Sequence, residues 1–217
     1  MSFNAISLKN IKGVLIDLDN TLYAYEPAHQ KAITACFEKY VEHVSSFETF
    51  TTRYRFHRTE VTKKLSPQGA CRSRLLAFQA LCEELNLTPS YYHALILANC
   101  YWDTFIEHMT IFPEAKAFLK KCKENQIPVC VVTDMLAETQ IKKIMKLELE
   151  PYITYLVSSE EAGTEKPHAS IFNLALKKLN CQAKHAIMIG DHPIKDINGA
   201  KELGIQTQLI EIPPSEK

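Results

Sequence analysis

The sequence lacks the features by which several classes of protein are recognised. Its 25 basic and 25 acidic residues balance, so the chain carries no net charge that would attract it to a nucleic acid or a membrane surface. No apolar run approaches the roughly 20 residues of a membrane-spanning helix, and the first ten residues lack the basic start and apolar core of a signal peptide. We therefore expect a soluble protein without a nucleic-acid or membrane partner, and nothing in the chain implies a protein partner.

Paired cysteine residues are also missing. The seven cysteine residues show no C-x-x-C spacing and their number is odd, which argues against a disulfide framework and against a zinc site. Reduced thiols are typical of proteins in the cytosol. Together with the missing signal peptide, they predict a cytoplasmic location.

The sequence does contain an alternation of two patterns. Short apolar runs typical of buried strands alternate, in the second half of the chain, with amphipathic stretches of helical period. This alternation predicts an α/β fold, a Rossmann-like parallel sheet with helices on both of its faces. The expected strands cover 13–17, 128–134, 155–159, 185–191 and 206–212, and the expected helices cover 113–125, 137–149, 167–180 and 193–204.

One long segment interrupts this alternation. It contains no convincing strand, and its pattern indicates helices over 26–45, 48–63, 69–86 and 90–108. Pro67 and Pro89 lie in the last two breaks, among signals for turns and helix starts. We predict a helical cap subdomain, 25–109, inserted into a core domain made of 1–24 and 110–217. The cap would lie over the carboxyl ends of the strands.

Two carboxylates follow the first expected strand. The stretch GVLIDLDNTL, residues 13–22, carries Asp17 directly after an apolar run and Asp19 two residues later. Aspartate residues near a turn can simply end a strand, because their side chains bond to the local backbone. In open α/β sheets, however, ligands bind beyond the carboxyl ends of strands. The partners of Asp17 and Asp19 elsewhere in the chain must decide between these two interpretations.

Chemically active side chains follow two further strands. Thr133 lies at the end of one apolar run, Asp191 ends another with Asp196 five residues later, and Lys166 lies in a loop before a proline. Each also has a structural explanation; the two aspartates, for example, could start a helix, where acids offset the dipole. In a parallel sheet, however, the strand ends share one edge, and clustered carboxylates repel one another unless a cation compensates. Such oxygen ligands suit Mg²⁺.

Four ordered motifs resemble those of the haloacid dehalogenase (HAD) superfamily. They are the stretch 17–21 (DLDNT), Thr133, the pair Lys166-Pro167, and Gly190-Asp191 with Asp196. The resemblance covers about 11–22 and 113–210, and the inserted helices look like the type I cap of that family. It implies a HAD-like α/β core with a helical cap, and phosphoryl chemistry at the shared edge of the sheet.

The resemblance also implies a role for each motif residue. Asp17 would be the nucleophile that forms an aspartyl-phosphate, and Asp19 would be the general acid and base. Thr133 and Lys166 would be catalytic residues that bind the transferring phosphoryl group. The Mg²⁺ ligands would be Asp17, the backbone carbonyl of Asp19, and Asp191, with Asp196 supporting the metal shell directly or through water.

Two residues beside the motifs depart from the usual pattern of the family. Asp134 follows Thr133 where Asn or Ser is frequent, and His192 follows Asp191 where Ser is frequent. For His192, contact with a loop, a place in the cleft and a simple helix start all remain open.

All five arginine residues lie between positions 53 and 74. A solvated helix face paired with acids would explain them, and so would a substrate clamp, because Arg binds carboxylate or phosphate through two parallel hydrogen bonds. Arg55 and Arg58 are three residues apart and can share a helix face, so they form the candidate substrate-binding pair. Arg72 and Arg74 diverge on a helix, so at most one of them should face the cleft.

Asp19 bears on the reaction that the resemblance implies. Dehalogenases and phosphonatases of the superfamily lack an acid at this position, so its presence favours phosphate ester chemistry. We expect a Mg²⁺-dependent phosphatase that acts on a small phosphorylated metabolite, either a sugar phosphate or a nucleoside monophosphate. A phosphomutase of the same fold and a non-catalytic HAD-like binding protein are the alternatives.

Overall fold

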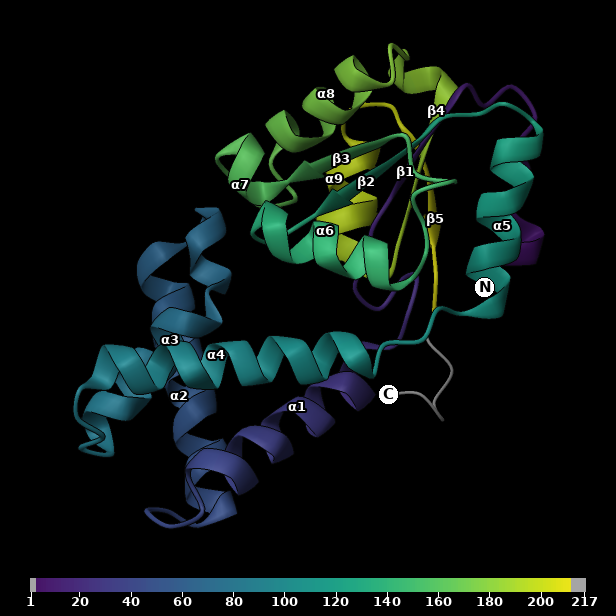
Figure 1. The fold of residues 1–217 in the computed structure, drawn as a ribbon. Coiled ribbons are helices and arrows are strands. Elements are labelled where there is room, and N and C mark those ends of the chain that lie inside the picture. The colour runs from purple at the N-terminus through teal and green to yellow at the C-terminus, as the bar shows by residue number, and fades with distance from the viewer. Residues whose placement is uncertain (1–2, 212–217) are drawn as a thin grey trace.

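A parallel sheet forms the centre of the molecule. The computed structural model describes residues 3–211, and within them five parallel strands form one sheet in the order β3-β2-β1-β4-β5 (Figure 1). They are β1 (Gly13–Ile16), β2 (Val129–Thr133), β3 (Tyr155–Ser158), β4 (Ala186–Gly190) and β5 (Gln206–Leu209). The predicted α/β, Rossmann-like fold is confirmed. Each strand is slightly shorter than predicted, and residue 212 of the last one lies outside the described residues.

The carboxyl ends of the central strands meet at one edge of the sheet. Ile16, the last residue of β1, pairs with Val131 of β2 and with Ile189 of β4. Because all three strands run in the same direction, the residues at or just after their ends emerge side by side. These residues are Asp17, Thr133 and Asp191.

Helices cover both faces of the sheet, and alternate residues of each strand point to opposite faces. In β1, Val14 and Ile16 belong to a core cluster with α5 and α6, whereas Leu15 belongs to one with α8 and α9. All three side chains are fully buried, as expected for a parallel sheet. The helices of this part are α5 (Pro113–Glu124), α6 (Ala137–Lys146), α7 (Ser159–Ala162), α8 (Ala169–Lys178) and α9 (Gly199–Lys201), with short 3-10 turns η1 (Phe3–Ala5) and η3 (Ala183–His185).

Between β1 and α5 the chain forms helices that pack mainly on one another, set apart from the sheet (Figure 1). They are α1 (Tyr25–Tyr40), α2 (Phe47–Leu65), η2 (Gly69–Arg72), α3 (Arg74–Glu84) and α4 (Ser90–Glu107). A single helix over 69–86 was the wrong prediction. Ser73 interrupts it, because its hydroxyl accepts the backbone N–H of Leu76 and so begins α3 as an N-cap. The division into a cap, 25–109, and a core stays a prediction.

The helix expected over 193–204 also divides. Its first part is a π-helical stretch, η4 (Pro193–Asn198), in which the N–H of Ile197 bonds to the carbonyl of His192, five residues back. The other predicted helices differ from the observed ones by a few residues at their ends. Within residues 3–211, no helix is both long and apolar enough to cross a membrane.

Candidate active site

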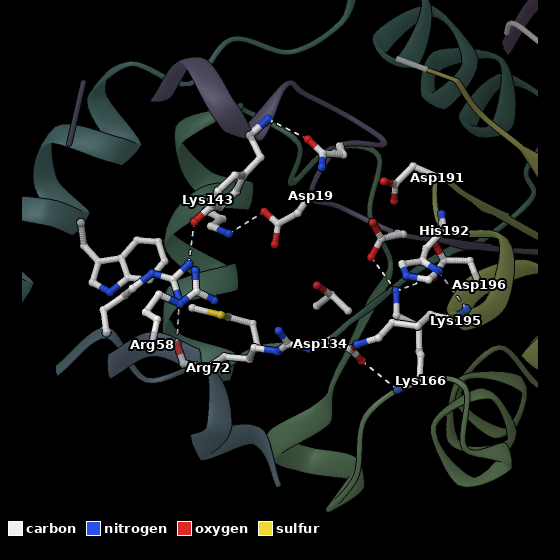
Figure 2. Close-up of a pocket in the computed structure, with 17 residues that line it drawn as sticks. Asp19, Arg58, Arg72, Asp134, Lys143, Lys166, Asp191, His192, Lys195 and Asp196 are labelled. Atoms are coloured by element: carbon white, nitrogen blue, oxygen red, sulfur yellow. Dashed lines mark hydrogen bonds and ion pairs between the residues drawn. The ribbon is translucent and has the colours of Figure 1, made fainter. Parts of the chain in front are cut away.

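A cavity of about 300 Å³ lies where the inserted helices approach the carboxyl edge of the sheet (Figure 2). Both parts of the chain line this cavity, with Arg58 and Trp102 on the side of the inserted helices. The structure brings the predicted motif residues together there: Asp17, Asp19, Thr133, Lys166, Asp191 and Asp196 all line the cavity.

Asp17 is held by two hydrogen bonds and is almost buried, with 5% of its surface exposed. One carboxylate oxygen accepts from Nζ of Lys166 at 2.6 Å, and the other accepts from the hydroxyl of Thr21 at 3.2 Å. Burial raises the pKa of Asp17 well above its ordinary value; the charge of Lys166 opposes this, while neighbouring carboxylates raise the pKa further. The carboxylate is therefore fixed in orientation, but one lysine does not offset the cost of its charge.

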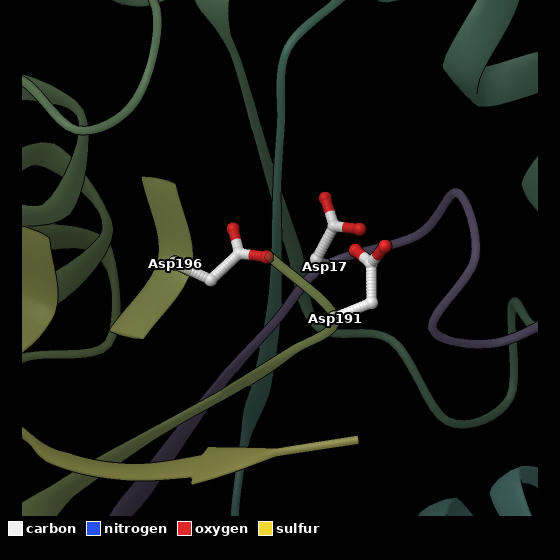
Figure 3. Close-up of side chains that lie close together, drawn as sticks. All are labelled: Asp17, Asp191 and Asp196. Carbon is white, nitrogen blue, oxygen red and sulfur yellow. The ribbon is translucent and has the colours of Figure 1, made fainter. Parts of the chain in front are cut away.

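Three carboxylates gather beside Lys166. Asp17, Asp191 and Asp196 each offer one oxygen, and these oxygens lie within 4.8 Å of one another (Figure 3). Burial, together with the charge of Asp196, raises the pKa of Asp191 to about 6. The surplus negative charge and the all-oxygen donor set fit a hard divalent cation such as Mg²⁺. The carboxylate of Asp19 does not belong to this group, and its backbone carbonyl stays a predicted ligand.

Lys166 is anchored at both its side chain and its backbone. Its ammonium also lies 2.7 Å from a carboxylate oxygen of Asp196 and donates to the carbonyl of Val132 at 2.9 Å. The backbone N–H of Lys166 donates to Asp134 at 2.8 Å, and the other oxygen of Asp134 accepts from Nζ of Lys195 at 2.7 Å. Asp134, whose role the sequence left open, thus holds the loop that presents Lys166.

The π-helical turn η4 places Asp196 in the site. Such turns are frequent at functional sites. His192 begins the turn: its Nδ1 accepts from the backbone N–H groups of Ile194 and Lys195, both at 3.2 Å, and the residue also lines the cavity. The close approach requires a glycine at position 190, because a Cβ on Gly190 would lie 2.3 Å from Oδ2 of Asp196.

The carboxylate of Asp19 is bound by three side chains that the sequence did not single out. Nζ of Lys143 donates to it at 2.6 Å (Figure 2), Nε2 of Gln140 donates at 3.2 Å, and the hydroxyl of Tyr23 also donates. Burial raises the pKa of Asp19. The charge and hydrogen bond of Lys143, with the bonds from Tyr23 and Gln140, outweigh burial and hold this pKa below its ordinary value.

The pattern of α6 contained a signal for these partners. Gln140 and Lys143 lie at helical spacing from Ile144 and Leu147, which are buried core residues. Both polar side chains are themselves buried. A polar pair on the apolar face of an amphipathic helix indicates that a buried partner faces it, although spacing alone does not identify that partner.

We expect Lys143→Met to destabilise the protein by about 1–3 kcal/mol at neutral pH, because it removes the cationic partner of a carboxylate that is only partly exposed. The Lys143 side chain is 1% exposed and that of Asp19 is 28% exposed. The free energy of unfolding in urea measures the effect. The matched control is Lys142→Met: Lys142 pairs with Glu138 on the open surface of the same helix, so its loss should have little effect. An equal decrease in the free energy of unfolding for Lys143→Met and Lys142→Met would contradict a stabilising role of the pair between Lys143 and Asp19.

Arg58 lines the cavity, but Arg55, its predicted partner in substrate binding, does not. Arg55 is exposed and borders a neighbouring surface depression. It lies one helical turn farther from the carboxyl end of α2 than Arg58 does, away from the site. Contrary to prediction, the structure therefore does not bring Arg55 to the cavity.

Arg72 and Arg74 both line the cavity, so the expectation that at most one of them would do so is wrong. The reason is local: Arg72 ends η2 and Arg74 begins α3, with Ser73 between them, so the two do not diverge as on one helix. Nη2 of Arg72 donates to Glu165 at 2.9 Å. Because Glu165 precedes Lys166, this ion pair joins the inserted helices to the loop that carries the lysine.

Comparison with known proteins identifies relatives over almost the whole chain. A sequence profile of haloacid dehalogenase-like hydrolases matches residues 14–210. The chain is 35% identical over 206 residues to the ribulose-1,5-bisphosphate 5-phosphatase of Halopiger xanaduensis, an alignment that covers 94% of this chain and 85% of that protein. It is 28% identical over 200 residues to the glyceraldehyde 3-phosphate phosphatase of Pyrococcus furiosus. This alignment covers 92% of this chain and 80% of that protein.

Solved structures share the fold. The 2-haloacid dehalogenase of Pseudomonas syringae pv. Tomato DC3000 superposes with a TM-score of 0.71 at 24% identity, covering 91% of this chain and 85% of that one. The HAD phosphatase of Thermococcus onnurineus superposes with a TM-score of 0.67 at 18% identity, and the match covers 93% of this chain and 86% of that one. The chain therefore belongs to the haloacid dehalogenase-like hydrolase family. Within that family it is an enzyme, a phosphatase.

Proposed function

We propose that this phosphatase depends on Mg²⁺ and hydrolyses a small phosphorylated metabolite through an aspartyl-phosphate on Asp17. The observation that carries the proposal is the gathering of Asp17, Asp191 and Asp196 beside the ammonium of Lys166. A phosphate dianion that approaches a carboxylate nucleophile is repelled, and positive charge on both sides removes this repulsion. Held by the three carboxylates, Mg²⁺ would supply positive charge to the nucleophile and to the phosphoryl oxygens.

In the first step, a carboxylate oxygen of Asp17 attacks phosphorus and the bond to the leaving oxygen breaks. Lys166 orients Asp17, and the hydroxyl of Thr133, buried at the end of β2, donates to a phosphoryl oxygen. Asp19 gives a proton to the leaving oxygen. Lys143 holds the pKa of Asp19 low, but an incoming phosphate adds negative charge beside the carboxylate and so raises this pKa.

In the second step, Asp19 takes a proton from a water molecule that attacks phosphorus, and Asp17 is released. One phosphate ester and one water give one alcohol and one inorganic phosphate. A phosphomutase would instead pass the phosphoryl group to another hydroxyl. It would require a bisphosphate activator and would leave the total of free phosphate unchanged.

The substrate class that we propose is a small sugar phosphate rather than a nucleoside monophosphate. The cavity of about 300 Å³ lies at the small end of the range of ligand pockets. Both relatives described above are named for phosphates of small sugars, ribulose 1,5-bisphosphate and glyceraldehyde 3-phosphate. These two observations support the proposal together.

Removal of metal tests the proposal. With p-nitrophenyl phosphate as substrate, EDTA should reduce phosphate release to background, because the carboxylates beside Asp17 then repel the incoming phosphate. Excess Mg²⁺ should restore the activity. Undiminished turnover in metal-free buffer would refute the metal dependence. If the phosphoryl group is transferred to an added alcohol and the amount of free phosphate does not rise, the result would favour a phosphomutase.

A further inference from the structure

The cations that line the cavity divide into two groups. Most have a carboxylate partner: Lys143 pairs with Asp19, Lys166 with Asp17 and Asp196, Lys195 with Asp134, and Arg72 with Glu165. Arg58 and Arg74 also line the cavity. Among the residues that the structure describes, no carboxylate lies within 4.0 Å of either guanidinium. Among the described residues, these two positive charges at the cavity therefore have no carboxylate paired with them.

Arg74 is held by polar and aromatic contacts, although no acidic residue among those described pairs with it. It is only 4% exposed; Nη2 donates to the hydroxyl of Tyr25 at 2.5 Å, and Nη1 donates to the carbonyl of Arg72 at 3.2 Å. Its guanidinium carbon lies 5.5 Å from the ring centroids of both Tyr101 and Trp102. Its Nε is buried without a hydrogen-bond partner. A buried charge without an acidic partner is costly unless a nearby anion compensates it.

Arg58 lines the same cavity as Arg74. Burial and then the positive charge of Arg74 lower the pKa of its guanidinium. Figure 2 shows Arg58 across the cavity from Asp191 and Lys166, which belong to the phosphoryl-transfer site. An anion between Arg58 and Arg74 would therefore lie away from the reacting phosphorus, at the other end of a bound substrate.

We propose that Arg58 and Arg74 bind the second, non-transferred phosphate of a small bisphosphate substrate. This inference rests on the proposed function, since it concerns the other end of the same substrate. A phosphate carries close to two negative charges at neutral pH, which matches two unpaired guanidinium groups, whereas a carboxylate would balance only one of them. Because Arg58 and Arg74 lie on the inserted helices and Asp17 lies on the sheet, such a substrate spans both parts of the chain.

A series of simple phosphate esters tests the inference. The probes are α,ω-alkanediols of three to six carbons, each as the bisphosphate, as the monophosphate, and with a carboxylate in place of the second phosphate. The wild-type enzyme with Mg²⁺ should favour the bisphosphate over the monophosphate of the best chain length by about 10- to 100-fold in kcat/KM, the range expected for charge-assisted hydrogen bonds.

Two variants and a matched control locate the effect. In Arg58→Gln the ratio of kcat/KM for bisphosphate to monophosphate should fall towards one. Arg74→Lys keeps the charge and preserves the fold better than replacement by a short side chain would. The ratio of kcat/KM for bisphosphate to monophosphate should fall only in part in this variant, because Lys lacks the planar fork of Arg. Arg55→Gln, three residues before Arg58 on α2 but outside the cavity, should keep the wild-type ratio.

Each other result has a distinct meaning. Equal kcat/KM for bisphosphates and monophosphates at every length, with p-nitrophenyl phosphate still hydrolysed, would overturn the inference and leave the proposed function standing. A carboxylate probe as good as the bisphosphate would overturn the assignment of a phosphate. If no phosphate ester is hydrolysed, the proposed function fails, and the Kd values of bisphosphate and monophosphate, measured by calorimetry on the same variants, then decide whether the anion site exists.

Discussion

Asp17→Asn is expected to reduce kcat by at least about 10⁴-fold with any phosphate ester, which is the scale on which removal of a nucleophile acts. The amide keeps the shape of the side chain, but it cannot attack phosphorus and it removes one of the three carboxylates beside Lys166. Because the aspartyl-phosphate cannot form, good and poor leaving groups should lose activity equally. Phosphate release from p-nitrophenyl phosphate with Mg²⁺ is the measurement.

The stability of Asp17→Asn should separate catalysis from folding. Burial raises the pKa of Asp17 in the folded protein, so at neutral pH the unfolded chain carries this charge more readily than the native one, and the ionised carboxylate lowers stability. Asn removes that cost, while Lys166 keeps its ion pair with Asp196. In metal-free buffer, the Tm should be equal to or higher than that of the wild type.

The control for this variant is Asp103→Asn, because Asp103 is exposed on α4 and does not line the cavity. It should keep the wild-type turnover. Near-normal activity of Asp17→Asn would show that another group attacks phosphorus. A cooperative unfolding transition at an unchanged or raised Tm would show that a loss of activity is chemical.

Asp19→Asn is expected to accumulate the phosphorylated enzyme. An aryl phosphate has a good leaving group that needs little protonation, so the first step should survive and release about one nitrophenol per site in a burst. Hydrolysis of the aspartyl-phosphate lacks its base and should slow by about 10²–10⁴-fold, the range for one general acid–base contribution. Acid quenching during turnover should trap phosphate on the protein.

Leaving-group dependence sharpens the test of Asp19. An alkyl phosphate needs protonation of its leaving oxygen, so the first step should slow as well and little phosphoenzyme should accumulate. With the double variant Asp17→Asn, Asp19→Asn, acid quenching should trap no phosphoenzyme with either substrate. Equal losses for aryl and alkyl phosphates, without a trapped species, would contradict a role of Asp19 in proton transfer.

The sheet and the edge at which the motif residues meet could be predicted from local patterns. All four residues of β1 are buried, and such an unbroken apolar run is typical of a parallel sheet covered on both faces. The run ends at Asp17, and another, β4, ends just before Asp191. Once the strands are parallel, their carboxyl ends share an edge, so these two carboxylates meet without any knowledge of side-chain packing.

Local patterns were less informative for the inserted helices and for the partners of the charges. The spacing of Arg55 and Arg58 lets them share a helix face, yet of the two only Arg58 reaches the cavity, because it lies one helical turn nearer to the carboxyl end of α2. Asp19 meets Lys143 across 124 positions of the sequence. An ion pair or hydrogen bond depends on distances of a few ångströms, and helical period indicates only which face of a helix is buried. The approach of α2 and α3 to the carboxyl edge of the sheet, and the packing of α6 on its face, therefore determine which charges are paired. They also determine which charges, like Arg58 and Arg74, line the cavity without an acidic partner among the described residues.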